Sequence, residues 1–332
     1  MNKKVVCVGG GTGVSMVLSG LKKYPLDLTA IVTMFDNGGS SGKLRKELGI
    51  LPLGDVRACL SVLSREKTVN PFFYCRFQRG ALKGHNVGNL LIAAAEQITG
   101  SLEKAIKRIG IILKVKGNVL PVTLKSSHIK VLLKNGKQIT GEEEIVNYQN
   151  LSKAGIKKIS LVPPVNANPS AILAIKEADV IIIGPGKFYT SIIPNLLVGG
   201  ISKAIAKSRA KKIFIANLMT QAGNTDNLKV EDFSRIIEEY LGKNIIDWVI
   251  FNTKNLSPDL LKEVRKTFPR TKAVDFSKDL LKSRKFIGKD ILDPDIKKIN
   301  PNDILIKKAN KRTMVLHDSD KLAKIIINLC KL

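Results

Sequence analysis

The sequence predicts an α/β fold, a Rossmann-like three-layer sandwich with a mostly parallel sheet. Short runs of β-branched and apolar residues lie between glycines, as strands buried on both faces do. Segments with apolar residues at helical spacing separate these runs, which is the pattern of βαβ units. Several runs end in small or polar residues: Gly9, Asp36, Gly184, Asn217 and Asn252. Because ligands of open parallel sheets bind beyond the carboxyl ends of the strands, we expect a ligand site at this edge.

The composition favours a single domain over residues 1–332. The chain has 332 residues, of which 44% are hydrophobic, and no obvious linker or low-complexity stretch interrupts it. The formal charge of +27 indicates either a polyanion partner or lysines spread over solvated helix faces. We favour the second interpretation, because the lysines are scattered and aromatic residues make up only 5% of the chain. We therefore expect no nucleic-acid partner, although the charge still attracts phosphorylated small molecules.

The cysteines and the apolar segments indicate a reduced, cytoplasmic protein. The four cysteines, Cys7, Cys59, Cys75 and Cys330, show no CxxC spacing, and we find no signal sequence. The longest apolar runs, such as residues 180–184, are far too short to span a bilayer. We therefore expect no membrane span. The oligomeric state stays open, with a homo-oligomer among the alternatives.

Residues 5–34 predict the first βαβ unit. Residues 5–8 form a β-branched run bounded by glycines, which is typical of a buried strand. Residues 15–23 carry apolar side chains at helical spacing and end at Tyr24-Pro25. Residues 28–34 form the second strand, and the crossover should be right-handed.

Short helices and a small β excursion follow. Asp55 sits where a helix N-cap belongs. Asn135-Gly136 is a strong hairpin signal, so residues 129–133 and 138–140 should pair, and residues 156–162 are also extended. We therefore expect a β-hairpin excursion from the main sheet at about 123–162. The helices are predicted at 43–48, 56–63, 90–99 and 102–113.

The α/β alternation returns in the second half of the chain. Pro169-Ser170 is expected to cap the first helix there. Strands are predicted at 179–183, 212–216 and 247–251, with an extended segment at 272–274. Helices are predicted at 171–178, 192–207, 230–241, 260–267 and 321–329.

The first glycine turn, residues 9–13, indicates a phosphate or nucleotide site. Its backbone allows close approach, and its amides lie at a helix N-terminus. It does not complete GxGxxG, because Val14 takes the last position, and it lacks the Lys-Ser/Thr of a Walker loop. A tight turn without a ligand is the alternative.

The acidic loop, residues 36–42, follows the second strand. Asp36 could hold a sugar hydroxyl or a hydrated magnesium ion, and Ser40 and Ser41 could bind phosphate. Asp55 could add a second carboxylate, or it could only cap a helix. Two carboxylates at a phosphate site favour a divalent metal, so magnesium is the candidate cofactor, with Asp36 and Asp55 as its ligands.

The histidines and the later glycine turn add further candidates. His85, His128 and His317 are widely spaced and form no zinc pattern, and no Ser-His-Asp signature occurs. We expect His85 to contact the ligand and His317-Asp318 to form a buried hydrogen-bonded pair. The turn at 184–190 offers backbone amides, hydroxyls and an aromatic face, or it is only a turn.

Together these motifs resemble the gluconeogenesis factor family, a bacterial branch of the 2-phospho-L-lactate transferase-like superfamily. The similarity covers nearly the whole chain in order, and the set of motifs is specific although no single one is. The matching stretches are 9–13, 36–42, 51–57, 84–90, 117–123, 178–191, 194–197, 217–221 and 317–318.

The resemblance implies a Rossmann-like domain that binds nucleotide-type ligands, notably UDP-sugars such as UDP-N-acetylglucosamine. It also implies a cytoplasmic role in carbon metabolism, cell-wall precursor supply and regulation of cell shape. Transferases of the superfamily move a phospho-lactyl group from a guanosine diphosphate carrier to a deazaflavin, with magnesium. Carried over to matching positions, the ligand-binding residues are Gly10, Gly11, Thr12, Gly13, Asp36, Asn37, Ser40, Ser41, Asn89, Gly184, Gly186, Tyr189, Thr190, Asn217, Thr220 and Gln221.

The sequence departs from the family pattern at positions that bear on catalysis. Asn37 stands where a second Asp is usual, Lys187 replaces a usual Ser, and Leu316 stands where an Arg commonly precedes His-Asp. Since a single carboxylate holds magnesium poorly, these departures favour binding over transferase chemistry. Our leading hypothesis is a UDP-sugar-binding regulatory protein with a protein partner and no catalytic residue. The alternatives are a phospho-lactate-type transferase with a nucleotide diphosphate donor and magnesium, and a nicotinamide-dependent dehydrogenase.

Overall fold

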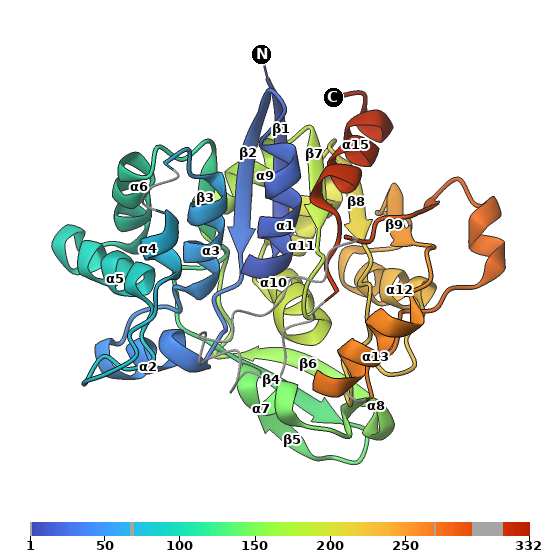
Figure 1. Cartoon of the computed structure of the whole chain (residues 1–332), viewed down its shortest axis with the longest axis horizontal. Helices are drawn as coiled ribbons and strands as arrows, with labels where there is room; N and C mark the ends of the chain where they lie inside the picture. The colour runs from blue at the N-terminus through green and yellow to red at the C-terminus, as the bar shows by residue number, and fades with distance from the viewer. Residues whose placement is uncertain (1, 67–69, 269, 294–314) are drawn as a thin grey trace.

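Seven parallel strands form the central sheet of the protein (Figure 1). The structure, a computed structural model, describes residues 2–66, 70–268, 270–293 and 315–332. Within these ranges the strand order is β10-β9-β8-β7-β1-β2-β3, and each neighbouring pair is parallel. The strands are β1 Lys3–Gly9, β2 Leu26–Val32, β3 Asn118–Pro121, β7 Val180–Ile183, β8 Lys211–Ile215, β9 Trp248–Asn252 and β10 Phe286–Lys289.

The strand order reverses between β1 and β7. From β1 the chain runs outward through β2 to β3, then crosses back to β7 and continues through β8 and β9 to β10. A sheet of this order has its ligand crevice where the order reverses, outside the carboxyl ends of the central strands. The predicted Rossmann-like α/β fold with a mostly parallel sheet is therefore confirmed.

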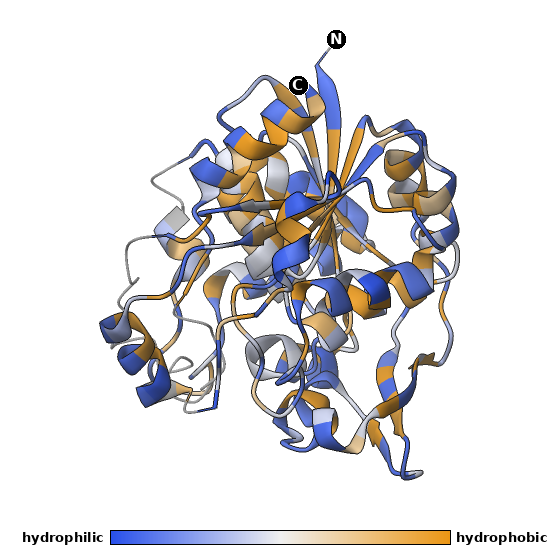
Figure 2. Cartoon of the chain, turned by 90° about the vertical axis from the view of Figure 1, so that its right-hand side faces the viewer, coloured by the Kyte–Doolittle hydropathy of each residue, from blue (hydrophilic) through white to orange (hydrophobic). Residues whose placement is uncertain are grey.

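Helices cover both faces of the sheet and complete the three layers. On one face α1 Gly11–Leu21 packs against α3 Gly54–Leu63 and α15 Ser319–Cys330. On the other face α11 Ile201–Lys207 contacts both α9 Pro169–Glu177 and α12 Val230–Leu241. Figure 2 shows apolar strands in the middle and polar residues on the outer sides of the helices. Each residue of β7 is buried, as a parallel strand between two helical layers requires.

The remaining described helices are short or lie at the sheet edges. None of the helices in the described ranges is long and apolar enough to cross a bilayer. The helices not yet named are α2 Gly39–Leu48, α4 Asn70–Tyr74, α5 Val87–Thr99, α6 Leu102–Ile112, α7 Glu142–Asn147, α8 Leu151–Ala154, α10 Ile193–Leu197, α13 Pro258–Thr267, the π-helical turn η1 Phe188–Ile192 and the 3-10 turn η2 Lys278–Lys282.

The predicted β excursion is a three-stranded antiparallel sheet of order β5-β4-β6. Its strands are β4 His128–Leu133, β5 Gln138–Thr140 and β6 Ile156–Val162. Gly136 has φ +85° in the hairpin turn, which the Asn-Gly pair predicted. In Figure 1 the arrowhead of β2 points towards this small sheet, so the sheet lies beyond the carboxyl edge of the main one.

Two predicted helices begin four residues too late. α1 begins at Gly11 and not at residue 15, and α2 begins at Gly39 and not at residue 43. Glycine has a low helix propensity, so the glycine-rich stretches were assigned to loops. In α1 the glycines are needed for close packing, because a Cβ atom on Gly11 would lie 2.6 Å from the Cα atom of Asp55.

Other differences have local causes. The predicted helix at 192–207 is interrupted between α10 and α11, where Gly200 takes φ +98°, and its first residue belongs to η1. Asn168, and not Pro169-Ser170, caps α9: its side chain accepts from the Ser170 amide. The extended segment at 272–274 forms only an isolated bridge to Met219. Two strands of the main sheet, β3 and β10, were not predicted, because each has only four residues and they contain Pro121 and Gly288.

The contact between α1 and α15 tests the packing of this layer. A Cβ atom on Gly20 would overlap the Ser319 carbonyl oxygen and lie 2.9 Å from the Ala323 Cβ atom. We expect Gly20→Ala to lower the free energy of unfolding by about 1–3 kcal/mol, as overpacked cores do. Urea denaturation measures it.

Gly110→Ala in α6 is the matched control. A Cβ atom there has no neighbour nearer than 3.9 Å. The substitution should stabilise the protein by up to about 1 kcal/mol through helix propensity. Equal stabilisation by both substitutions would contradict the close contact of α1 with α15.

Candidate functional site

Two glycine turns meet where the strand order reverses. One follows β1 and the other follows β7. A Cβ atom built on Gly186 would lie 3.8 Å from the Gly10 nitrogen, so the two backbones nearly touch. A Cβ atom on Gly13 would overlap the carbonyl oxygen of Pro185. Gly13 is therefore needed to pack α1 on the second turn, because any side chain would separate them.

The first turn of α1 has an internal partner for one of its amides. The Asp55 carboxylate accepts a hydrogen bond from the buried Gly11 amide. Asp55 is therefore not the N-cap of α3 that the sequence predicted; Leu53 holds that position. Thr12 is exposed. The amides of Thr12 and Gly13 have no acceptor within the helix, since they belong to its first turn.

The two predicted phosphate-binding serines lie in the first turn of α2 and are buried. Ser41 Oγ accepts from the Gly54 amide over 3.1 Å. Ser40 Oγ accepts from the Asn86 amide over 3.2 Å and from Asn89 Nδ2 over 3.3 Å. Both hydroxyls thus have protein partners in the ligand-free chain, and their contact with phosphate stays a prediction.

Asn89 and His85 belong to the same buried network. Asn89 Oδ1 accepts from Arg57 Nε over 3.1 Å, and His85 Nδ1 lies 3.4 Å from the Ser40 hydroxyl. Arg57 also donates to the Phe73 carbonyl. These hydrogen bonds hold α2, α3 and α5 together near the carboxyl edge of the sheet. Sequence reasoning missed Arg57, whose partners are distant in sequence.

Asn37 is bound to the β excursion. Its Oδ1 accepts from the Glu143 amide over 2.8 Å, and its Nδ2 donates to Glu144 Oε2 over 2.9 Å. Both polar groups of this side chain therefore hold the first turn of α7. An aspartate could accept the first hydrogen bond but would place a second carboxylate against Glu144. The amide at this position thus has a structural cause.

Four charged side chains, Asp36, Asp55, Glu142 and Lys187, form a charged cluster beside the turns. Lys187 Nζ lies 2.7 Å from Glu142 Oε1. Burial, Glu142 and Asp55 together raise the pKa of Asp36 to about 7. Burial also raises the pKa of Asp55. Burial lowers the pKa of Lys187, but Glu142 and the two aspartates outweigh it, so the net shift is upward.

Buried polar atoms without a hydrogen-bond partner gather at the strand ends. Among the described residues they include Thr33 Oγ1, Thr190 Oγ1, Asn195 Oδ1 and Asn217 Oδ1. These side chains follow β2, β7 and β8. Asn195 and Asn217 are held by their amide groups, which donate to main-chain carbonyls of the two glycine turns over 3.1 and 2.9 Å. Because buried polar groups nearly always have partners, this edge is suited to a polar ligand or ordered water.

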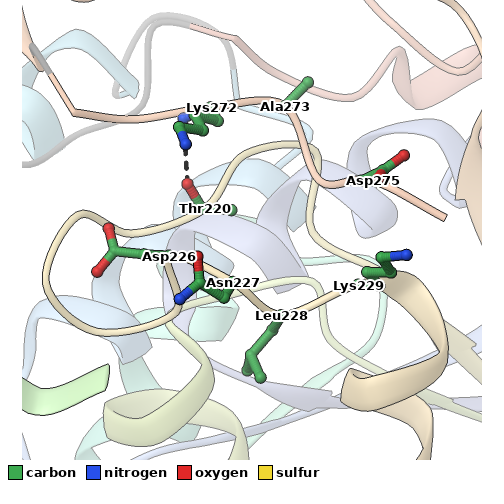
Figure 3. Close-up of a pocket in the computed structure, with 8 residues that line it drawn as sticks. All are labelled: Thr220, Asp226, Asn227, Leu228, Lys229, Lys272, Ala273 and Asp275. Atoms are coloured by element: carbon green, nitrogen blue, oxygen red, sulfur yellow. Dashed lines mark hydrogen bonds between the residues drawn. The ribbon is translucent and has the colours of Figure 1, made fainter. Parts of the chain in front are cut away.

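Tyr189 and the residues after β8 line two hollows. Thr220 borders a cavity of about 330 Å³, and its Oγ1 accepts from the Lys272 amide over 3.1 Å (Figure 3). Tyr189 borders a smaller cavity of about 130 Å³. The Gln221 amide donates to Thr225 Oγ1. The other residues of the larger cavity are Asp226, Asn227, Leu228, Lys229, Lys272, Ala273 and Asp275.

The protein alone supplies too few oxygen atoms to coordinate magnesium. Within the described ranges no group of three His, Cys, Asp or Glu side chains could hold a metal ion. Asp36 and Asp55 supply two carboxylates, and Mg²⁺ in such sites takes its other oxygens from water and phosphate. Both carboxylates raise the pKa of Lys187, whose ammonium already supplies a positive charge to this cluster. Magnesium binding thus stays a prediction.

His317 and Asp318 do not form the predicted pair. His317 Nε2 lies 3.1 Å from the Ala216 carbonyl oxygen. Asp318 caps α15 and accepts from the amides of Asp320 and Lys321. Burial lowers the pKa of His317 to about 4. The pair was wrong because the capping function of Asp318 turns its carboxylate towards its own helix.

The raised pKa of Asp36 gives stability a pH dependence. The folded protein binds the Asp36 proton more tightly than the unfolded chain, so the free energy of unfolding falls as pH rises from about 4 towards 7. Asp36→Asn removes this titration and keeps an acceptor for the Gly38 amide. We expect the variant to be more stable than the native protein at pH 8 by about 1 kcal/mol or more.

Chemical denaturation at several pH values measures this difference, which should vanish near pH 4. Asp27→Asn, on an exposed position of β2, is the matched control and should show no such trend. A difference between Asp36→Asn and the native protein that does not vary with pH would contradict the raised pKa.

The Asn37 contact is tested by Asn37→Asp. At pH 8 the new carboxylate would face Glu144 and lose the amide donor. We expect a loss of about 1 kcal/mol in the free energy of unfolding. Adding Glu144→Gln should recover most of this loss, since an amide then faces the carboxylate; thermal denaturation of the four variants of this cycle measures the coupling. Equal stability of Asn37→Asp and the native protein would show that Asn37 does not hold α7.

Comparisons with known proteins agree with this architecture. The family model described as 2-phospho-L-lactate transferase CofD matches residues 5–292. The Gluconeogenesis factor of Bacillus subtilis is 38% identical over 331 residues, which cover 99% of this chain and 98% of that protein. The Gluconeogenesis factor of Halalkalibacterium halodurans is 44% identical over 261 residues, 77% of this chain and 79% of that protein.

A solved structure shows that the similarity extends to the fold. A crystal structure of a UPF0052 family protein from Bacillus halodurans superimposes with a TM-score of 0.86 at 36% sequence identity. The match covers 98% of this chain and 99% of the other. The resemblance inferred from the sequence motifs is thereby confirmed. With the parallel sheet and the glycine turns at its point of reversal, these matches show that the chain belongs to the 2-phospho-L-lactate transferase CofD family, together with the gluconeogenesis factors.

Proposed function

We propose that the protein binds a nucleotide sugar of the UDP-N-acetylglucosamine type and acts as a cytoplasmic regulatory protein. The observation that carries this proposal is the set of unpartnered polar atoms around two facing glycine turns. Thr190, Asn195 and Asn217 offer buried oxygen atoms there. A nucleotide sugar has the matching chemistry, because it combines a diphosphate with many hydroxyl groups.

Each part of the ligand has a candidate partner. The free amides of Thr12 and Gly13 at the N-terminus of α1 suit the diphosphate. Lys187 supplies a nearby positive charge. Asp36 can accept from a sugar or ribose hydroxyl, and the half-buried Tyr189 offers an aromatic face to the base. Ser40, Ser41, Asn89 and Gln221 would then support the walls of the site.

The cellular role is proposed from the family. Relatives bear the name gluconeogenesis factor. A sensor of UDP-sugars would link carbon metabolism to cell-wall precursor supply and cell shape through a protein partner. Binding is favoured over catalysis because Asn37 is occupied by α7 and Lys187 faces the carboxylates. The transferase alternative requires Asp36 and Asp55 to hold magnesium together.

A thermal-shift screen tests the ligand class. We expect UDP-N-acetylglucosamine or UDP-glucose to raise the Tm, because a ligand that binds only the folded state stabilises it by mass action, by about 2.7 kcal/mol at a concentration 100 times the Kd. GDP with magnesium tests the transferase alternative, and NADP tests the dehydrogenase alternative. A shift with GDP and magnesium but with no UDP-sugar would overturn the proposal.

Thr12→Tyr tests the position of the diphosphate. The exposed Thr12 can be enlarged without disturbing the core, and a tyrosine would block approach to the α1 amides. We expect this variant to abolish the shift caused by UDP-N-acetylglucosamine, while Thr12→Ser keeps it. An unchanged shift in Thr12→Tyr would mean that the first glycine turn only packs α1.

A further inference from the structure

We propose that Lys187 is the resident cation of the charged cluster, so that the ligand diphosphate binds without a divalent metal. This inference rests on the proposed function and deepens it. It assigns to one side chain of the chain the charge that a metal ion would otherwise supply. Three observations support it: the position of Lys187, its contact with Glu142, and the hydrogen bonds that tie both polar groups of Asn37 to α7.

The second glycine turn places Lys187 at the point where the strand order reverses. It directly follows Gly186 and holds the N-cap position of η1. Gly186 in turn approaches the backbone of Gly10 at the first glycine turn. The Lys187 side chain thus begins beside the two turns and reaches towards α7.

The contact of Lys187 with Glu142 joins a half-exposed side chain to a buried one. The two groups are 2.7 Å apart, and the Glu142 side chain is only 9% exposed while that of Lys187 is 42% exposed. The buried Glu142 carboxylate holds the end of the lysine side chain. An ammonium has three donors, so after Glu142 takes one, two remain for phosphate oxygens.

Asp36 and Asp55 both raise the pKa of Lys187, and they lie beside the start of α3 and the first glycine turn. Asp36 Oδ2 would lie 3.7 Å from a Cβ atom on Gly54, and Asp55 Oδ2 would lie 3.5 Å from a Cβ atom on Gly10. Neighbouring carboxylates repel each other in a partly buried site and need a positive charge. Lys187 provides it.

A divalent ion would have to displace this lysine. If Lys187 moved away, Glu142 would be left as a buried carboxylate without its cation, which is costly. The residue next to Asp36 gives no compensating ligand, since Asn37 holds α7 with both polar groups. The ammonium therefore stays and binds the incoming phosphate as a point charge.

Isothermal titration with UDP-N-acetylglucosamine tests this assignment. For the native protein we expect the same Kd in EDTA and in excess magnesium. In Lys187→Ala, the Kd in EDTA should rise about tenfold or more, because a charge-assisted hydrogen bond is lost. Magnesium should then restore much of the affinity, since the carboxylates are free. Metal-dependent binding by the native protein, or tight binding by Lys187→Ala in EDTA, would overturn the inference.

Two further variants control for folding and for net charge. Lys187→Met combined with Glu142→Gln removes the ion pair without leaving a buried charge, and it should weaken binding in EDTA as Lys187→Ala does. Lys176→Ala removes one positive charge from the last turn of α9, at the opposite edge of the sheet, and should bind as the native protein does. Weak binding by Lys176→Ala would assign the effect to net charge and would overturn the inference.

A second titration separates this inference from the proposed function. Mn²⁺ is added to the protein without nucleotide, so the result does not depend on the ligand class. We expect saturable Mn²⁺ binding in Lys187→Ala but not in the native protein, and Asp36→Asn should abolish it in the Lys187→Ala background. If no UDP-sugar binds, the proposed function fails, while this titration still decides the function of Lys187. Saturable Mn²⁺ binding by the native protein that Asp36→Asn removes would overturn the inference.

Discussion

The pairing of β1 with β7 is the constraint on which the site depends. It brings together two strands that are about 170 residues apart and places their following turns against each other. Backbones can approach this closely only where side chains are absent, which explains the glycines on both turns. In sheets of this kind the ligand binds where the strand order reverses. The polar side chains that follow β2 and β8 reach the same edge because all these strands are parallel.

The charged cluster shows a conflict between stability and binding. Asp36 and Asp55 are partly buried near each other and near Glu142, and all three would repel each other without Lys187. A protein selected only for stability would place apolar or neutral side chains here. The orphaned oxygens of Asn195 and Asn217 add to the cost. Several interactions that lower the folding stability at one place are typical of a functional site, where binding of the ligand offsets strain and desolvation.

The fold could be predicted because its signals are local. β-branched runs, helical spacing and the Asn-Gly turn each involve a few neighbouring residues, and they predicted five of the seven described strands of the main sheet and the hairpin. Glycines misled the helix boundaries, since in α1 they allow close contacts with distant segments such as Asp55 and Ser319. Propensity within the chain segment cannot report such contacts.

The sequence placed the candidate site at the strand ends, but it could not supply the contacts of the side chains there. Its place followed from the strand ends, but the partners of its side chains are distant: Asp55 binds Gly11, and Asn37 binds the start of α7. Glu142, the partner of Lys187, was not among the predicted site residues. One sequence signal could have found this partner. Lys187 is a cation within a glycine turn, and such a cation needs an acidic residue nearby.

The attachment of α7 has a mechanical consequence. Asn37 follows β2 and Lys187 follows β7, so this short helix is tied to both halves of the sheet, one on each side of the point of reversal. A sliding movement between the two halves would strain both the Asn37 hydrogen bonds and the Lys187–Glu142 ion pair. α7, which contacts β4 and β5 of the small sheet, therefore links the two halves of the main sheet across the point of reversal.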